Sequence, residues 1–291
     1  MIVDYIISAL GLGALYALLT IGVALLFGVL GLMNFAYGEI ILAAAFALYF
    51  FRDAPWVFAV AMAVVFAVAV ALLSERLAFH PLRGADPVTL MIASFAVSLA
   101  LQSVARMTVL PRTQGVPPQD FLAQRVDILG ARVSVRDLVT LVLCGVVLAA
   151  VAYLMGRTSL GVQLRAAAEN FQMAESLGVR GNRVIASAFV IAGVLAAVGA
   201  VVLVARQGAV SAQMGLQPML IGVIGAVLGG MSSLRGAALG GFILGVGTAT
   251  LEAVLPSDLI AFRDAFLFTA LIGVLVVRPQ GLLSGSKVRV S

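Results

Sequence analysis

Long runs of apolar residues recur along this 291-residue chain, and they constrain its fold more than any other feature. A helix of ~20 apolar residues is long enough to cross the ~30 Å hydrocarbon core of a bilayer. Six runs approach that length, and three shorter runs have the same character. The six are 5–30, 55–73, 88–105, 138–155, 184–204 and 237–255, and the three are 35–51, 218–231 and 259–277.

These runs are predicted to be helices, because they lack the alternating pattern of barrel strands and because backbone groups in lipid must bond within their own segment. We therefore predict an all-α, polytopic membrane protein with about eight or nine transmembrane helices in a single domain over 1–291. The N-terminus lacks a basic segment, and its first apolar run is too long for a cleavable signal. That run is expected to remain as the first span, and lipid is expected to surround the protein.

The net charge of +5 comes from basic residues that flank the apolar runs. This distribution is typical of membrane proteins and argues against a nucleic-acid partner. If the helices alternate in direction, ten basic residues fall on the side of 156–183 and the C-terminus, and eight fall on the other side. The small excess favours a cytoplasmic position for 156–183 and an external position for the N-terminus.

Residues that build common catalytic and metal sites are scarce. Lysine, histidine and cysteine each occur once, at Lys287, His80 and Cys144, and no phosphate-binding G-x-x-x-x-G-K-[ST] loop is present. A single histidine and a single cysteine do not suffice for a tetrahedral zinc site or a nucleophile–base pair. We therefore expect no metal, no cofactor and no enzymatic activity in this chain.

Two polar interruptions divide the apolar runs. The first extends from Asn34 to Glu39, where Asn34 is a good helix N-cap and Glu39 suits the positive end of the helix dipole. Either these residues begin a helix at the membrane surface, or they line a solute pathway through a broken helix. The second interruption, 229–236, is rich in glycine, which by itself permits close helix packing. Its corresponding place in the other half of the chain favours a pathway between the halves.

The segment 110–137 is predicted to be an external loop. Residues 126–135 alternate in character around Gly130, a pattern typical of a small β-hairpin at the membrane surface. We treat the loop as a connector or as a contact for a soluble partner.

The polar segment 156–183 is predicted to contain one amphipathic helix of three to four turns. Leu164, Ala168, Phe171, Ala174 and Leu177 recur at three- and four-residue spacing and share one face, and Gly178 is placed to end the helix. An interfacial helix on lipid is one interpretation. The narrow alanine-rich stripe, flanked by the charged Arg165, Glu169 and Glu175, favours docking against another protein.

Several stretches resemble the permease subunits of bacterial branched-chain amino acid ABC transporters of the LivH-like type. They lie in the same order along nearly the whole chain: 13–18 with 34–39, 165–179, 228–237, 264–266 and 278–282. Two positions depart from the family pattern, since Tyr37 stands where many members have histidine and Leu234-Arg235 replaces a small residue and proline.

The resemblance implies a multi-pass protein of the bacterial inner membrane that works with other chains. Its expected partners are a second, LivM-like permease or another copy of this chain, two cytoplasmic ATPase subunits and an external solute-binding protein. The absence of a phosphate loop agrees with separate ATPase subunits, because ATP hydrolysis would then occur in another chain.

The candidate pathway residues are Asn34, Phe35, Tyr37, Gly38, Glu39, Gly229, Gly230, Ser232 and Ser233. The candidate residues for the cytoplasmic coupling helix in 156–183 are Arg165, Ala168, Glu169, Phe171, Ala174, Glu175, Leu177 and Gly178, with Phe171 pressing into a groove on the ATPase.

Three other functions stay open. A permease for urea or short amides shares most of these motifs, although Phe35 leans towards amino acids. An ion-coupled secondary transporter would act without an ATPase. An intramembrane enzyme is the most distant alternative.

Overall fold

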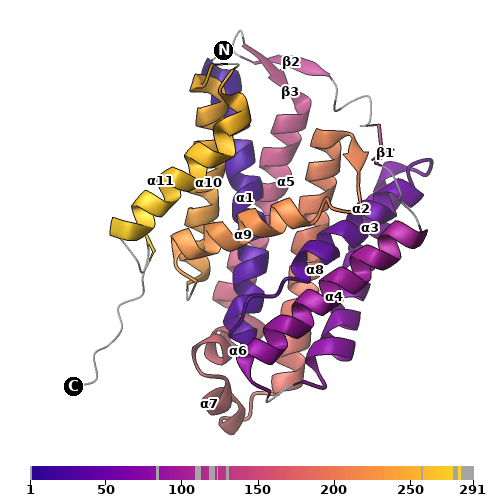
Figure 1. Cartoon of the computed structure of the whole chain (residues 1–291), viewed down its shortest axis with the longest axis vertical. Helices are drawn as coiled ribbons and strands as arrows, with labels where there is room; N and C mark the ends of the chain where they lie inside the picture. Colours follow the sequence, from indigo (N-terminus) through magenta and orange to yellow (C-terminus); the bar gives the residue numbers. More distant parts are fainter. Residues whose placement is uncertain are drawn as a thin grey trace.

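The computed structural model describes residues 2–82, 85–108, 113–117, 122, 124–128, 131–231, 233–256, 258–277 and 281–282. Within these residues the chain is a bundle of helices, most of which run along its long axis (Figure 1). Two minimal strand pairs lie at the end of the bundle that carries the N-terminus, and the helices of the segment 156–183 lie at the opposite end.

Among the described residues, six helices are long and apolar enough to cross a membrane, and they coincide with the six long apolar runs. They are α1 (Ile2–Leu30), α3 (Trp56–Ser74) with its π-helical extension η1 (Glu75–Phe79), α4 (Pro87–Thr108), α5 (Val135–Arg157), α8 (Gly181–Gln207) and α10 (Leu234–Val254). Three shorter apolar helices are α2 (Tyr37–Phe50), α9 (Leu216–Gly229) and α11 (Arg263–Val277), the last preceded by the 3₁₀ turn η3 (Ile260–Phe262). The predicted polytopic helical fold is confirmed.

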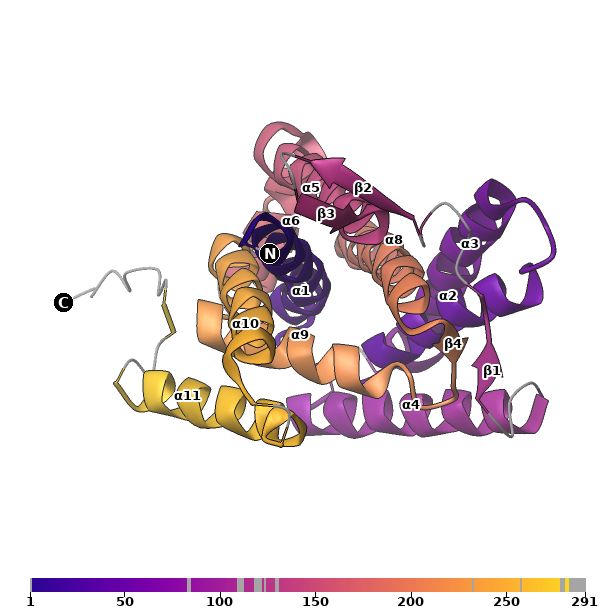
Figure 2. The ribbon, with the colours of Figure 1, turned by 90° about the horizontal axis from the view of Figure 1, so that it is seen from above.

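Helix α1 is the centre of the bundle and contacts α5, α8, α9 and α10 (Figure 2). Lipid tails are as apolar as leucine, so helices in a membrane associate mainly through close packing of small residues. Helix α10 follows this rule, because a Cβ added to Gly245 would lie only 2.6 Å from the Cα of Gly13 on α1. Packing by small residues therefore holds α1 and α10 together.

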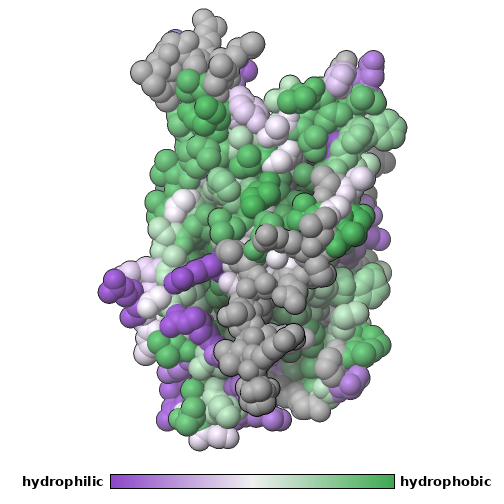
Figure 3. Space-filling view, turned by 90° about the vertical axis from the view of Figure 1, so that its left-hand side faces the viewer, coloured by the Kyte–Doolittle hydropathy of each residue, from purple (hydrophilic) through white to green (hydrophobic). Residues whose placement is uncertain are grey.

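Helix α3 packs on α2 and α8 and buries alanines at every fourth position, namely Ala59, Ala63, Ala67 and Ala71. Its remaining face exposes large apolar side chains such as Phe58, Val65 and Leu73. The space-filling view shows a broad hydrophobic band with hydrophilic residues gathered mostly below it (Figure 3). Such a surface is typical of a protein whose sides face lipid.

The predicted hairpin is formed by β2 (Arg125–Ile128) and β3 (Ala131–Ser134), which pair antiparallel with Asp127 opposite Arg132. Gly130 lies outside the described residues. A second antiparallel pair joins β1 (Gln114–Gly115) to β4 (Ala209–Val210). Helix α5 already begins at Val135, within the segment 110–137 that is predicted to be an external loop.

Candidate functional site

The break between α1 and α2 is organised by Asn34. Its Oδ1 accepts a hydrogen bond from the backbone N–H of Ala36 at 3.0 Å, and its carbonyl oxygen accepts one from the N–H of Tyr37 at 3.2 Å. Helix α2 begins only at Tyr37, and Ala36 occupies the N-cap position. The prediction that Asn34 caps the helix directly is therefore wrong, because a short turn intervenes between this residue and α2.

Glu39 lies inside the bundle, with only 3% of its surface exposed. Its Oε1 accepts hydrogen bonds from Ser98 Oγ at 2.9 Å and from Gln102 Nε2 at 2.8 Å, both on α4. Arg106 continues this network by donating to Gln102 Oε1 at 3.3 Å. Since Ser98 is near the middle of α4, the carboxylate of Glu39 lies at the depth of the centre of that helix.

Phe35 also faces α4. Its backbone N–H donates to Ser94 Oγ at 3.3 Å, and its ring meets that of Phe95 edge-on with 6.1 Å between the centroids. Ser94 lies four residues before Ser98, so a polar stripe at four-residue spacing on α4 faces the start of α2.

Several buried polar atoms at this break have no hydrogen-bond partner among the described residues. They are Asn34 Nδ2, Tyr37 Oη and Glu39 Oε2. Leaving one such atom unsatisfied costs ~1–3 kcal/mol, so each needs an explanation. A site through which polar solute or water passes in another conformation would provide one.

The N-terminal ends of the two shorter helices α2 and α9 meet at Gly38 and Gly215. A Cβ added to Gly38 would lie 2.8 Å from the carbonyl oxygen of Gly215, and one added to Gly215 would overlap the carbonyl of Gly38. Beside this junction, the hydroxyl of Tyr37 rests against the backbone of Gly22 on α1. Half-length helices whose N-termini meet inside a membrane protein are a common way to build a solute site.

The second predicted interruption lies at the other end of α9. Gly229 packs so tightly on α10 that a Cβ would overlap the carbonyl of Gly236, and Ser233 Oγ caps α10 by accepting from the N–H of Gly236 at 3.1 Å. Gly230 ends α9, and Ser232 lies outside the described residues. Because the 14 residues of α9 extend ~21 Å at the usual helical rise, the structure does not bring the two interruptions together.

The segment 156–183 forms two helices, α6 (Ser159–Glu169) and α7 (Phe171–Ser176), and not the single helix predicted. Asn170 separates them with an extended backbone, φ −155° and ψ 103°. Its N–H closes α6 on the carbonyl of Ala166 at 3.0 Å, while its Oδ1 caps α7 by accepting from the N–H of Met173 at 2.9 Å. An asparagine side chain that bonds nearby backbone in this way competes with helix continuation.

The bend divides the predicted apolar face. Leu164 and Ala174 are buried as predicted, but Ala168 is exposed and Ala167 is buried in its place. Leu177 is 80% exposed. Phe171 is half-buried and packs inward, since a Cβ added to Gly181 at the start of α8 would lie 2.8 Å from its Cζ.

The charged residues of this segment, Arg165, Glu169 and Glu175, are exposed. The predicted stop at Gly178 is confirmed. Its φ is +91°, its N–H donates to the carbonyl of Glu175 at 2.9 Å, and the N–H of Val179 donates to that of Ala174 at 3.1 Å. These two bonds form the Schellman motif that ends many helices.

A cavity of about 260 Å³ lies near the end of the bundle that carries the N-terminus. Its lining residues come from α1, α8, α9 and α10 and from the start of α11: Leu12, Leu15, Tyr16, Leu19, Leu203, Arg206, Gln207, Gln217, Pro218, Ile221, Glu252 and Arg263. Sequence reasoning missed this cavity because it counted Arg206 and Arg263 only as charges that flank membrane spans.

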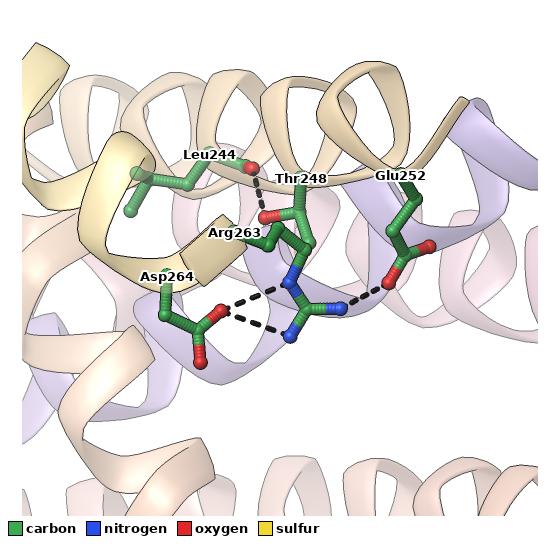
Figure 4. Close-up of polar contacts among 5 residues, drawn as sticks. All are labelled: Leu244, Thr248, Glu252, Arg263 and Asp264. Atoms are coloured by element: carbon green, nitrogen blue, oxygen red, sulfur yellow. Dashed lines mark hydrogen bonds and ion pairs between the residues drawn. The ribbon is translucent and has the colours of Figure 1, made fainter. Parts of the chain in front are cut away.

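The two arginines of the cavity are held by carboxylates. Arg263 forms ion pairs with Glu252 of α10 and with Asp264, its neighbour on α11 (Figure 4). Arg206 at the end of α8 pairs with Asp137 of α5 at 2.9 Å. These contacts fix the positions of the charged groups around the cavity.

Comparison with known proteins identifies relatives along the whole chain. The profile of the family described as "Branched-chain amino acid transport system / permease component" matches residues 5–277. The high-affinity branched-chain amino acid transport system permease protein BraD of Pseudomonas aeruginosa is 30% identical, over 97% of this chain and 96% of its own. The corresponding LivH protein of Escherichia coli K12 is also 30% identical, over 95% of this chain and 94% of its own.

Among solved structures, PsaBC from Streptococcus pneumoniae in complex with Fab has a similar fold. The TM-score is 0.55 at 13% sequence identity, and the likeness covers 96% of this chain and 97% of the other.

Proposed function

This chain belongs to the family of permease components of branched-chain amino acid transport systems, and from that membership we propose that it is a membrane subunit of an ABC importer for branched-chain or other apolar amino acids. It would form half of the solute pathway in the bacterial inner membrane. A second permease chain, two ATPase subunits and an external binding protein would complete the transporter. The observation that carries the proposal is the match to transport permeases along nearly the entire chain.

The proposed pathway runs past the junction of α2 and α9. Asn34, Phe35, Tyr37, Gly38 and Glu39 are gathered there, and the unpartnered atoms of three of them support a role in contacting polar solute. Gly229, Gly230, Ser232 and Ser233 would act at the far end of α9. The close packing of Gly229 on α10 would make this end of α9 a pivot rather than a solute contact.

The proposed coupling element is the bent pair α6–α7, at the end of the bundle remote from the N-terminus (Figure 1). The buried Leu164 and Ala174 and the half-buried Phe171 join the pair to the bundle, whereas Met173 and Leu177 expose apolar surface outward. Arg165, Ala168, Glu169 and Glu175 are exposed around them. Movement of an ATPase docked on the outward side would therefore reach α8 through Phe171.

The test is uptake by proteoliposomes that contain the assembled complex. We expect ATP-dependent accumulation of labelled leucine with the complete complex and none with this chain alone. Uptake by the chain alone, driven by an ion gradient, would support a secondary transporter. Accumulation of urea in place of leucine would support the amide permease.

A further inference from the structure

The cavity near the N-terminal end of the bundle has two kinds of wall. Its base is aliphatic, formed by Leu12, Leu15 and Leu19 of α1, Leu203 of α8, and Pro218 and Ile221 of α9. Leu19 packs between two glycines, since a Cβ added to Gly199 would lie 2.7 Å from its Cδ2 and one added to Gly222 would lie 3.1 Å from its carbonyl oxygen. This tight contact with α8 and α9 makes Leu19 a firm part of the base.

The remaining walls carry charge of opposite sign on opposite helices. Arg206 of α8 lines the cavity, while its partner Asp137 does not. On the other side, Arg263 is shared between two carboxylates, Glu252 and Asp264, which leaves an excess of one negative charge (Figure 4). Glu252 lines the cavity and its side chain is 43% exposed, so its carboxylate is accessible.

Two neutral amides complete the polar wall. Gln207 follows Arg206 at the end of α8, and Gln217 lies in the first turn of α9. Each can donate and accept hydrogen bonds. A cavity with few polar groups around an apolar base is the usual form of a small-molecule site.

We infer that this cavity is a binding site for a zwitterionic amino acid with a short aliphatic side chain. The ammonium group lies towards Glu252, the carboxylate lies towards Arg206 and the amides, and the side chain rests on Leu12, Leu203 and Ile221. The inference rests on the proposed function for its class of solute. It extends that function by placing a solute site on the side of the bundle opposite to α6–α7, where the first turn of α9 joins the cavity to the α2–α9 junction at Gly215.

The test uses the fact that the chain has one cysteine, Cys144, which is fully buried on α5. In a Cys144→Ala background, Gln217→Cys places a thiol in the cavity wall. The matched control is Leu220→Cys, on the same helix but outside the lining. Right-side-out vesicles that contain the assembled transporter are treated with a membrane-impermeant maleimide, with and without saturating leucine.

We expect the Gln217→Cys thiol to react from the outside and leucine to abolish that reaction. Glutamate should not protect it, and leucine should not change the reaction of Leu220→Cys. A second experiment fills the cavity with a bulky side chain. Ile221→Trp should abolish leucine uptake, whereas Leu220→Trp, outside the lining, should retain it.

The outcomes distinguish a failure of the binding-site inference from a failure of the proposed function. If the wild-type complex takes up leucine but leucine leaves the Gln217→Cys reaction unchanged, or if the thiol reacts only from the inside, the inference is wrong and the proposed function stands. If Ile221→Trp transports leucine normally, the cavity is not the site. If the wild-type complex does not take up leucine at all, the proposed function is wrong, and the class of solute inferred for the cavity falls with it.

Discussion

Ser98 on α4 donates a hydrogen bond of 2.9 Å to Glu39 at the start of α2, a contact between residues 59 positions apart in the chain. Gln102, one turn further along α4, donates to the same oxygen. These bonds join the broken part of the bundle to a helix that also exposes the large apolar side chains of Ile92, Leu99 and Met107. The polar contact between α2 and α4 thus lies just behind an apolar outer surface.

Removal of the Glu39 carboxylate should impair both stability and transport. In Glu39→Ala, Ser98 and Gln102 lose their acceptor, and each buried donor left unpaired costs ~1–3 kcal/mol. Glu39→Gln retains an acceptor oxygen and should keep most of the stability. Thermal unfolding in detergent measures the first effect, and the KM for leucine uptake measures the second. Unchanged uptake kinetics in Glu39→Ala and Asn34→Ala would remove both residues from the proposed pathway.

The contact between Gly38 and Gly215 should tolerate no side chain. Gly215→Ala places a methyl group on the carbonyl of Gly38, and such overpacking costs ~1–3 kcal/mol or more. The matched control is Gly145→Ala on α5, where nothing lies within 4 Å of the added Cβ. That change should be neutral or stabilise by up to ~1 kcal/mol, because alanine favours helix. Equal melting temperatures for the two variants would contradict the close contact.

Much of the architecture could be predicted from the sequence because membrane helices follow from local composition. Each of the six long apolar runs forms a helix long and apolar enough to span a membrane, and the stop at Gly178 followed from the need for a residue that adopts positive φ. The hairpin at β2 and β3 followed from alternation around a glycine. These features depend on residues that are neighbours in the chain.

The remaining features of the fold and the site depend on single side-chain caps or on contacts between residues distant in the sequence. The spacing of apolar residues reports neither. A spacing of three and four residues predicted one helix through 164–177, yet a single side-chain cap at Asn170 ended it. Glu39 could be placed at a helix start, but its depth was set by α4, a partner distant in sequence. The cavity between α1, α8 and α9 could not be predicted, because it brings together charged residues from helix ends that lie more than 50 residues apart in the sequence, such as Arg206 and Arg263.

The bend between α6 and α7 and the end of α7 should depend on two residues, Asn170 and Gly178. Asn170→Ala removes the cap on the N–H of Met173 and should destabilise α7 by ~1 kcal/mol. Gly178→Ala forces a side chain into a backbone with φ of +91°, which costs ~1–2 kcal/mol. Hydrogen exchange of the amides of α7 in the purified protein should accelerate in both variants. Gly156→Ala, with nothing within 4 Å of its Cβ, should leave that exchange unchanged.

Docking of the ATPase should depend on the outward residues of α7 more specifically than on Phe171. Phe171→Asp removes a contact with Gly181 of α8, so this variant disturbs the permease itself as well as its surface. Leu177→Asp and Met173→Asp change only exposed apolar side chains. If these anchor the interface, each contributes ~2 kcal/mol or more, and its loss lowers the affinity for the ATPase roughly thirtyfold or more. We expect loss of ATPase co-purification and of ATP-dependent uptake, with normal membrane insertion. Val126→Asp, which also changes an exposed apolar residue but on the hairpin at the other end of the bundle, is the control and should transport normally. Retention of the ATPase by both α7 variants would show that docking lies elsewhere.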